Sequence, residues 1–274
     1  MHVFKTQIDL QAYLQKNAVN KSIGFTPTMG ALHKGHFELI NTSIKACDIS
    51  ICSIFINPTQ FNNIDDLNNY PKTLDDDIKK LRELNCDILY APEKDDLYKD
   101  NEQAKKYEFS GLENEMEGKY RPGHFNGVAT IIEKLFNIIN PTYAYFGQKD
   151  LQQVQIIKKL VTQKKIKTKI VRVSTVRDTN GLAMSSRNAR LNDFEKKKAT
   201  FIYQNLLECK TRFPENLEVI KKDINTAFKN NPYLKLEYIA FVDLNSLRPI
   251  KDWLGKGENA VCIAAYLNNI RLSI

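Results

Sequence analysis

The sequence has few of the residues that build metal centres and disulfide frameworks. It contains four histidines and five cysteines, and no two cysteines form a Cys-x-x-Cys pair. Because structural zinc sites are built from such closely spaced ligands, zinc is a weak interpretation here. The number of cysteines is odd and most stand in apolar runs, which is typical of reduced, buried thiols. We therefore expect a cytoplasmic protein.

Long apolar stretches are also missing. No run of about 18 apolar residues, the length needed to cross a bilayer, occurs in the chain. The opening residues, Met-His-Val-Phe-Lys-Thr, lack the basic and apolar regions of a signal peptide. We expect neither membrane insertion nor export. The 274 residues are 42% hydrophobic, which is enough for one large domain or two smaller ones.

A basic motif interleaved with aromatic residues is the third missing feature. The formal net charge of +8 is compatible with nucleic-acid binding, but the lysines are spread along the chain. A solvated lysine-rich surface is the simpler explanation, and a positive field also suits an anionic substrate such as a nucleotide. We expect no nucleic-acid partner. A non-enzymatic RNA-binding protein stays open as the alternative from another class.

The most informative stretch is residues 22–41, SIGFTPTMGALHKGHFELIN. An apolar run before Pro27 predicts a strand, and apolar residues at helical spacing from Phe37 predict a helix. The glycine loop between them carries His33 and His36, where free amides and the helix dipole favour an anion such as phosphate. An ordinary P-loop is unlikely because His36-Phe37 replaces its Lys-Ser/Thr. The alternative is that both histidines only cap or pack the helix start.

Two later segments repeat this strand-then-polar-loop pattern. Residues 49–56 form a β-branched run that ends at Asn57-Pro58, and residues 143–147 lead directly into Lys149 and Asp150. Ligands of parallel sheets gather at the carboxyl ends of the strands, so these loops are expected beside the histidine loop. The pattern predicts an α/β fold, Rossmann-like, with a doubly wound parallel sheet.

The lengths and composition of the remaining segments predict the domain organisation. We expect a nucleotide-binding domain over residues 1–176 and a smaller α+β domain over residues 177–274, which contributes a Ser-Ser-Arg loop at its start. Residues 93–120 are charged and suit a loop or flap over the site. The helix expected after Arg121 is apolar so far round that it is either buried or packs on a second subunit.

Five separated blocks of the chain resemble, in family order, the pantothenate synthetases, the pantoate and β-alanine ligases of the nucleotidylyltransferase superfamily. The blocks are Pro27-Thr-Met-Gly-Ala-Leu-His-Lys-Gly-His36 with its His-x-Gly-His signature, Asn57-Pro-Thr-Gln-Phe61, Arg121-Pro-Gly-His-Phe-Asn-Gly-Val128, Phe146-Gly-Gln-Lys-Asp-Leu-Gln-Gln153 and Gly181-Leu-Ala-Met-Ser-Ser-Arg-Asn188. Departures are small: Lys72 stands where Arg is common and Ile56 where Val is common.

The resemblance implies a reaction in two halves. The carboxylate of (R)-pantoate attacks the α-phosphorus of ATP, which gives pantoyl adenylate and diphosphate. The amine of β-alanine then attacks the adenylate and gives pantothenate and AMP. The resemblance also implies Mg²⁺ as the companion of ATP and a homodimer. Another nucleotidylyltransferase, one that releases a stable nucleotidyl product, is the nearest alternative.

The same resemblance implies roles for individual residues. His36 is the proton donor, His33 serves the triphosphate and Lys149 stabilises charge on the α-phosphoryl group. The implied ATP-binding set is Met29, Gly30, His33, His36, Gly147, Lys149, Asp150, Val176, Met184, Ser185, Ser186 and Arg187. The implied pantoate and β-alanine set is Gln60, Gln153 and Asn57. Magnesium is implied at Asp76 and Asp77, although acids in the first turn of a helix also complement its dipole.

Overall fold

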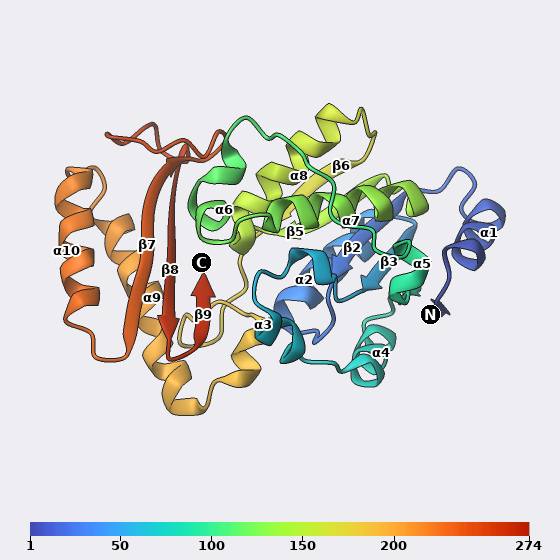
Figure 1. Ribbon diagram of the computed structural model, residues 1–274, viewed down its shortest axis with the longest axis horizontal. Coiled ribbons are helices and arrows are strands. Elements are labelled where there is room, and N and C mark those ends of the chain that lie inside the picture. The colour runs from blue at the N-terminus through green and yellow to red at the C-terminus, as the bar shows by residue number, and fades with distance from the viewer. Residues whose placement is uncertain (274) are drawn as a thin grey trace. The chain divides into compact units, whose positions relative to one another are not determined.

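The computed structural model describes residues 1–273 and divides into two compact units, Met1–Ser174 and a second unit from Thr175 onward. Figure 1 shows the elements of both units. The division lies two residues before the boundary expected from the sequence. Among the described residues, no helix combines the length and the apolar character needed to cross a membrane.

The first unit is built on a six-stranded sheet of order β1-β4-β3-β2-β5-β6, in which every pair is parallel. The strands are β1 (His2–Phe4), β2 (Ile23–Thr28), β3 (Ile49–Ile54), β4 (Ile88–Tyr90), β5 (Tyr143–Gly147) and β6 (Lys169–Val173). The chain proceeds from β2 to one side through β3 and β4, then returns to β5 and β6 on the other side. This is the predicted doubly wound α/β fold.

Helices cover both faces of this sheet. They are α1 (Gln7–Asn17), α2 (Lys34–Ala46), α3 (Ile64–Asn68), α4 (Leu74–Glu83), α5 (Lys94–Leu97), α6 (Met116–Tyr120), α7 (His124–Ile139) and α8 (Leu151–Gln163), with short 3₁₀ helices η1 (Pro58–Gln60), η2 (Leu112–Asn114) and η3 (Gln148–Asp150). Ile40 of α2 and Leu81 of α4 pack against Cys52 of β3. Phe136 of α7 meets Phe25 of β2 edge to face at a ring-centroid distance of 6.2 Å.

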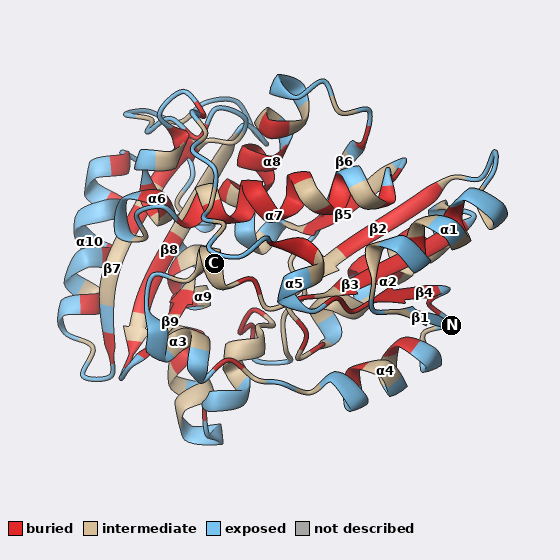
Figure 2. Ribbon diagram, turned by 45° about the vertical axis from the view of Figure 1, so that its right-hand side comes forward, coloured by how far each residue is buried: buried red, intermediate tan, exposed pale blue. Residues whose placement is uncertain are grey.

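Helix α7 is buried along most of its length within its own unit, as Figure 2 shows. Part of the segment expected as a flap lies along it: the Lys105 amide donates to Thr130 at 2.9 Å, and the Tyr107 hydroxyl donates to Glu133 at 2.7 Å. Burial raises the pKa of Glu133, but hydrogen bonds from Lys105, Tyr107 and Lys164 outweigh it and bring that pKa to about 2. Residues 105–107 are therefore a loop bound to α7, which agrees with the first of the two expected alternatives, a loop or a flap.

The second unit has the predicted α+β character. Its three-stranded antiparallel sheet is β7 (Leu234–Asp243), β8 (Asn259–Leu267) and β9 (Ile270–Ser273), and its helices are α9 (Asp193–Thr211), α10 (Leu217–Lys229) and the 3₁₀ helix η4 (Ser186–Arg190). Ile202, Ile224 and Ile263 are fully buried in its core. Arg271 of β9 pairs with Glu237 of β7 at 2.9 Å.

Candidate active site

The loops that follow β2, β3 and β5 meet at one edge of the sheet because β2 lies between the other two strands. The chain turns in opposite directions from β2 and β5, and such a switch point opens a crevice at the carboxyl ends of the strands. The Gln60 amide, after β3, donates to the sulfur of Met29, after β2, at 2.8 Å. The loops expected to share a site are therefore brought together.

The two histidines of the loop cap helix α2 through one ring nitrogen each. Nδ1 of His33 accepts from the Gly35 amide at 3.1 Å, and Nδ1 of His36 accepts from the His33 amide at 3.4 Å. The two rings stack with centroids 4.0 Å apart. Because Nδ1 accepts in both rings, a neutral imidazole carries its hydrogen on Nε2. Both histidines thus cap the helix, as the alternative expected, but the caps use only Nδ1 and leave the Nε2–H groups as donors.

Both imidazoles are held neutral. Burial, with Lys149 adding to it, lowers the pKa of His33 to about 4. The pKa of His36 is lowered well below its ordinary value, first by burial and then by His33, Lys149 and Lys80. At pH 7 both rings are therefore uncharged hydrogen-bond donors, and the positive charge beside them comes from the lysines. This combination favours an anion.

These pKa values predict a pH profile. A folded-state pKa near 4 means that His33 gains a proton well below the 6.5 of a free imidazole, so its neutral form persists from pH 7.5 down to pH 5.5. We expect kcat/KM for ATP to show no loss from histidine protonation over that range. Steady-state rates in constant-ionic-strength buffers check this. An inflection near pH 6.5 that vanishes in His33→Asn would contradict it.

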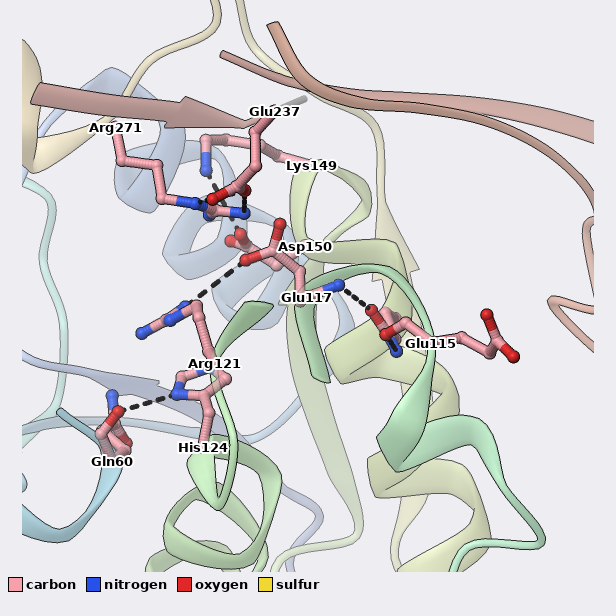
Figure 3. Close-up of polar contacts among 10 residues, drawn as sticks. Gln60, Glu115, Glu117, Arg121, His124, Lys149, Asp150, Glu237 and Arg271 are labelled. Carbon is pink, nitrogen blue, oxygen red and sulfur yellow. Dashed lines mark hydrogen bonds and ion pairs between the residues drawn. The ribbon is translucent and has the colours of Figure 1, made fainter. Parts of the chain in front are cut away.

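Lys149 stands at the carboxyl end of β5, on η3. Its ammonium pairs with the carboxylate of Asp150 (Figure 3), and the nitrogen and oxygen are 3.2 Å apart. The Lys149 side chain is only 19% exposed, whereas that of Asp150 is 52% exposed. The ammonium is thus partly shielded from solvent, and its charge acts on both imidazoles. The end of β5 therefore lies close to the histidine loop.

Asn57 is fully enclosed by protein partners. Tyr98 and Thr59 donate to its Oδ1 at 2.8 and 3.0 Å, and its Nδ2 donates to Gln60 Oε1 at 3.2 Å and to the Gly127 carbonyl at 3.1 Å. With 1% exposure, Asn57 has the geometry of a residue that orients Gln60. This differs from the direct substrate contact that the resemblance implied.

His124 fixes the backbone of the same loop. Its Nδ1 contacts the Gln60 carbonyl (Figure 3), and the two atoms are 2.8 Å apart. Burial, with Arg121 adding to it, lowers the pKa of His124 to about 3, so the ring is neutral and Nδ1–H donates. The sequence analysis assigned no chemistry to His124 or Tyr98. For His124 the only signal was its place in the family block that begins at Arg121, and Tyr98 had no such signal.

Two neighbouring glutamines of α8 have different surroundings. Gln152 is 4% exposed; it accepts from the Glu117 amide at 2.9 Å and donates to the carbonyls of Leu112 and Glu115. Gln153, expected to hold substrate, is half-buried on the first turn of the helix. Gln152 therefore joins η2 and α6 to α8. The expected contact of Gln153 with substrate stays a prediction.

Asp76 and Asp77, the implied magnesium ligands, do not share a site. The Asp76 side chain is 65% exposed and pairs with Lys79 at 3.5 Å. Asp77 is 0% exposed, and both of its oxygens accept hydrogen bonds from protein groups. Within residues 1–273, no three His, Cys, Asp or Glu side chains gather as a metal site. The geometry does not fit magnesium on Asp77.

The remaining expected ATP ligands lie in the second unit, on a short turn that precedes η4. The Met184 amide donates to the Val176 carbonyl at 2.9 Å, which closes the turn. Ser185 caps η4 by accepting from the Arg187 amide at 3.3 Å. Ser186 and Arg187 are half-buried within this unit. Within the second unit, the hydroxyls and the guanidinium expected to bind ATP therefore lie on one short turn and the start of η4.

Comparison with known proteins identifies the family. The model of the family described as pantoate-beta-alanine ligase matches residues 2–273. The chain belongs to the pantoate-β-alanine ligase family. The pantothenate synthetase of Flavobacterium psychrophilum is 46% identical over 275 residues, which cover 99% of this chain and 98% of the relative. That of Azobacteroides pseudotrichonymphae is 45% identical over 280 residues, 99% and 98% of the two chains.

Solved structures of this ligase family share the fold over the whole length. The crystal structure of pantothenate synthetase from Thermus thermophilus superposes with a TM-score of 0.92 at 33% identity, and covers 100% of this chain and 98% of its own. The pantoate-β-alanine ligase from Francisella tularensis, described as complexed with beta-gamma ATP and β-alanine, gives 0.83 at 36% identity, with 100% and 96% covered. The predicted family, ligase class and fold are confirmed, and the stable-product alternative is not favoured.

Proposed function

We propose that the protein condenses (R)-pantoate with β-alanine at the expense of ATP, through a pantoyl adenylate, and that the crevice above β2 and β5 holds the reaction. One observation carries the assignment of this site. Two neutral imidazoles, His33 and His36, offer Nε2–H donors at the start of α2 beside the ammonium of Lys149. Such donors stabilise the negative charge of a phosphoryl group in transfer.

The first half-reaction needs ATP held with its α-phosphorus accessible. We assign the triphosphate to His33 and His36, and the α-phosphoryl charge to Lys149. Asp150, beside that ammonium, suits the ribose hydroxyls as an acceptor. The backbone set is Met29, Gly30 and Gly147, and the second-unit set is Val176, Met184, Ser185, Ser186 and Arg187, whose serines and arginine would grip the leaving diphosphate.

His36 would act as a neutral hydrogen-bond donor, since its low pKa leaves it uncharged. This refines its expected role as proton donor: the imidazole donates a hydrogen bond through Nε2–H. Mg²⁺ would enter with ATP and neutralise charge on its phosphate oxygens. Asp77 takes no part in holding it, because its oxygens are already engaged.

The second half-reaction needs pantoate fixed while the amine of β-alanine attacks the activated carbonyl, with AMP leaving. We assign pantoate to Gln60 and Gln153, whose amides both donate and accept. Asn57 holds the Gln60 side chain and His124 holds its carbonyl, so the glutamine is oriented before substrate arrives. A cytoplasmic homodimer completes the proposal; light scattering of the purified protein tests the dimer.

The activity is tested with ATP, magnesium, (R)-pantoate and β-alanine, and with each substrate omitted in turn. We expect pantothenate and AMP together, only in the complete mixture, when products are followed by mass spectrometry. Diphosphate release without pantothenate would keep the adenylating site and overturn the acceptor. No nucleotide turnover by folded protein, with an RNA mobility shift that survives physiological salt, would favour the RNA-binding alternative.

A further inference from the structure

The loop between β2 and α2 has a backbone that needs outside support. Gly30 and Ala31 have φ values of +82° and +49°, both in the left-handed region. For a residue with a Cβ, such as Ala31, that conformation is sterically strained. A Cβ placed on Gly30 would lie 3.1 Å from Ile54 and 3.2 Å from Asp77. The loop therefore runs tightly between the end of β3 and helix α4.

Helix α4 supplies the support through Asp77. Oδ2 accepts from the Ala31 amide at 2.8 Å and from the Thr73 hydroxyl at 3.0 Å, and Oδ1 accepts from the Leu32 amide at 2.8 Å. Two successive amides of the loop thus share one buried carboxylate. Hydrogen bonds to a charged group are stronger than those between neutral groups, and the two from successive amides oppose the strain at Ala31.

Lys80, one turn along α4, completes the arrangement. Its ammonium donates to the Leu32 carbonyl at 3.1 Å and lies 3.6 Å from the Asp77 carboxylate. The Leu32 amide is therefore bound by the Asp77 carboxylate and the Leu32 carbonyl by the Lys80 ammonium, both from α4. Residue 33 is the next in the chain, and its side chain begins the histidine pair. Any shift of this backbone would redirect both rings, because His36 is bonded to the His33 amide.

We propose that Asp77 and Lys80 form a positioning pair that holds residues 30–32 and thereby aims His33 and His36 at the nucleotide phosphates. The pair acts through the backbone and binds neither metal nor substrate. The proposal rests on the proposed function, since it concerns the same site, and it replaces the magnesium role that the family resemblance implied for Asp77.

The decisive variant is Asp77→Asn, which keeps the size of the side chain but replaces one acceptor by an N–H that faces a backbone amide. We expect kcat/KM for ATP to fall by about tenfold or more, the equivalent of one charged hydrogen bond. The magnesium concentration for half-maximal rate should stay within about twofold, since no ligand is lost. Asp75→Asn, on the same first turn but exposed, is the matched control and should match the wild type.

A second readout does not depend on turnover. The ¹⁵N shifts of the His33 and His36 imidazoles report their tautomer and hydrogen bonds, and should change in Asp77→Asn but not in Asp75→Asn. If Asp77→Asn does not fold, Lys80→Met removes the bond to the Leu32 carbonyl and the ion pair with Asp77, leaves the Asp77 bonds to the loop amides in place, and should change the same shifts. Adding Ala31→Gly to Asp77→Asn should restore part of the lost rate, because glycine adopts the left-handed conformation freely.

The outcomes separate the alternatives. Unchanged imidazole shifts with a half-maximal magnesium concentration raised about tenfold would make Asp77 a metal ligand and overturn the proposal. Unchanged shifts and unchanged rates would show that the loop holds itself, which also overturns it. Changed shifts in a protein whose wild type forms no pantothenate would uphold the positioning pair and refute the proposed function.

Discussion

Lys149→Ala is expected to lower kcat for pantothenate formation by about two orders of magnitude or more, while the protein stays folded. Removal of one positioned electrostatic group from an active site commonly costs about 10²–10³ in rate. Lys149 sits at the end of β5, and its charge reaches both imidazoles of the histidine loop. Diphosphate release in single turnover without β-alanine should fall equally, because the lost charge serves the first half-reaction.

Two further variants qualify this result. Lys158→Ala removes an exposed lysine from α8 and should leave kcat within about twofold, since an exposed charge contributes little. Lys149→Arg keeps the charge but not the compact ammonium, and should recover only part of the rate. Near-normal turnover in Lys149→Ala with unchanged thermal stability would remove this residue from the mechanism.

Replacement of His36 by alanine is expected to cost about two orders of magnitude in turnover and also some stability. The ring has two tasks: Nδ1 accepts from the His33 amide at the start of α2, and Nε2–H is the donor assigned to the triphosphate. Loss of a helix cap costs about 0.5–2 kcal/mol, so chemical unfolding should detect it. Loss of the donor should appear in kcat for the complete reaction.

Conservative variants separate the two tasks. In His36→Asn the amide oxygen takes the place of Nδ1, so we expect near-wild-type stability with turnover still about 100-fold down. In His36→Gln the amide nitrogen can reach the place of Nε2, and part of the rate should return. His2→Asn, on the exposed end of β1, is the control. Equal rates in His36→Asn and the wild type would refute the assignment of Nε2–H.

The sequence by itself determined the local elements that carry the site and the family to which the chain belongs. The strand, glycine loop and helix over residues 22–41 follow from apolar periodicity and from glycine and proline, which act on near neighbours. The strands over 49–56 and 143–147 could be predicted in the same way. Because parallel strands place their carboxyl ends at one edge, the convergence of the loops after β2, β3 and β5 could also be predicted.

Two short edge strands, β1 and β9, could not be predicted from the sequence. β1 and β9 have three and four residues, too few for a periodic signal. The position of β1 beside β4 is a long-range choice that nothing in the first residues encodes. The charged segment over 93–120 was expected to be a loop or flap because of its composition, and its contact with Glu133, a buried carboxylate on α7, could not be predicted.

Only the tertiary structure decided what each buried polar side chain does. Asp75, Asp76 and Asp77 are alike in sequence, but only Asp77 faces the loop and accepts from Ala31, 46 residues earlier. Asn57 resembled a ligand for substrate until its partners, among them the carbonyl of residue 127, had been placed. A polar group that is buried must find a partner, and that partner is set by packing between distant segments. Local sequence therefore indicates where polar chemistry can occur, and the fold determines which groups remain available for it.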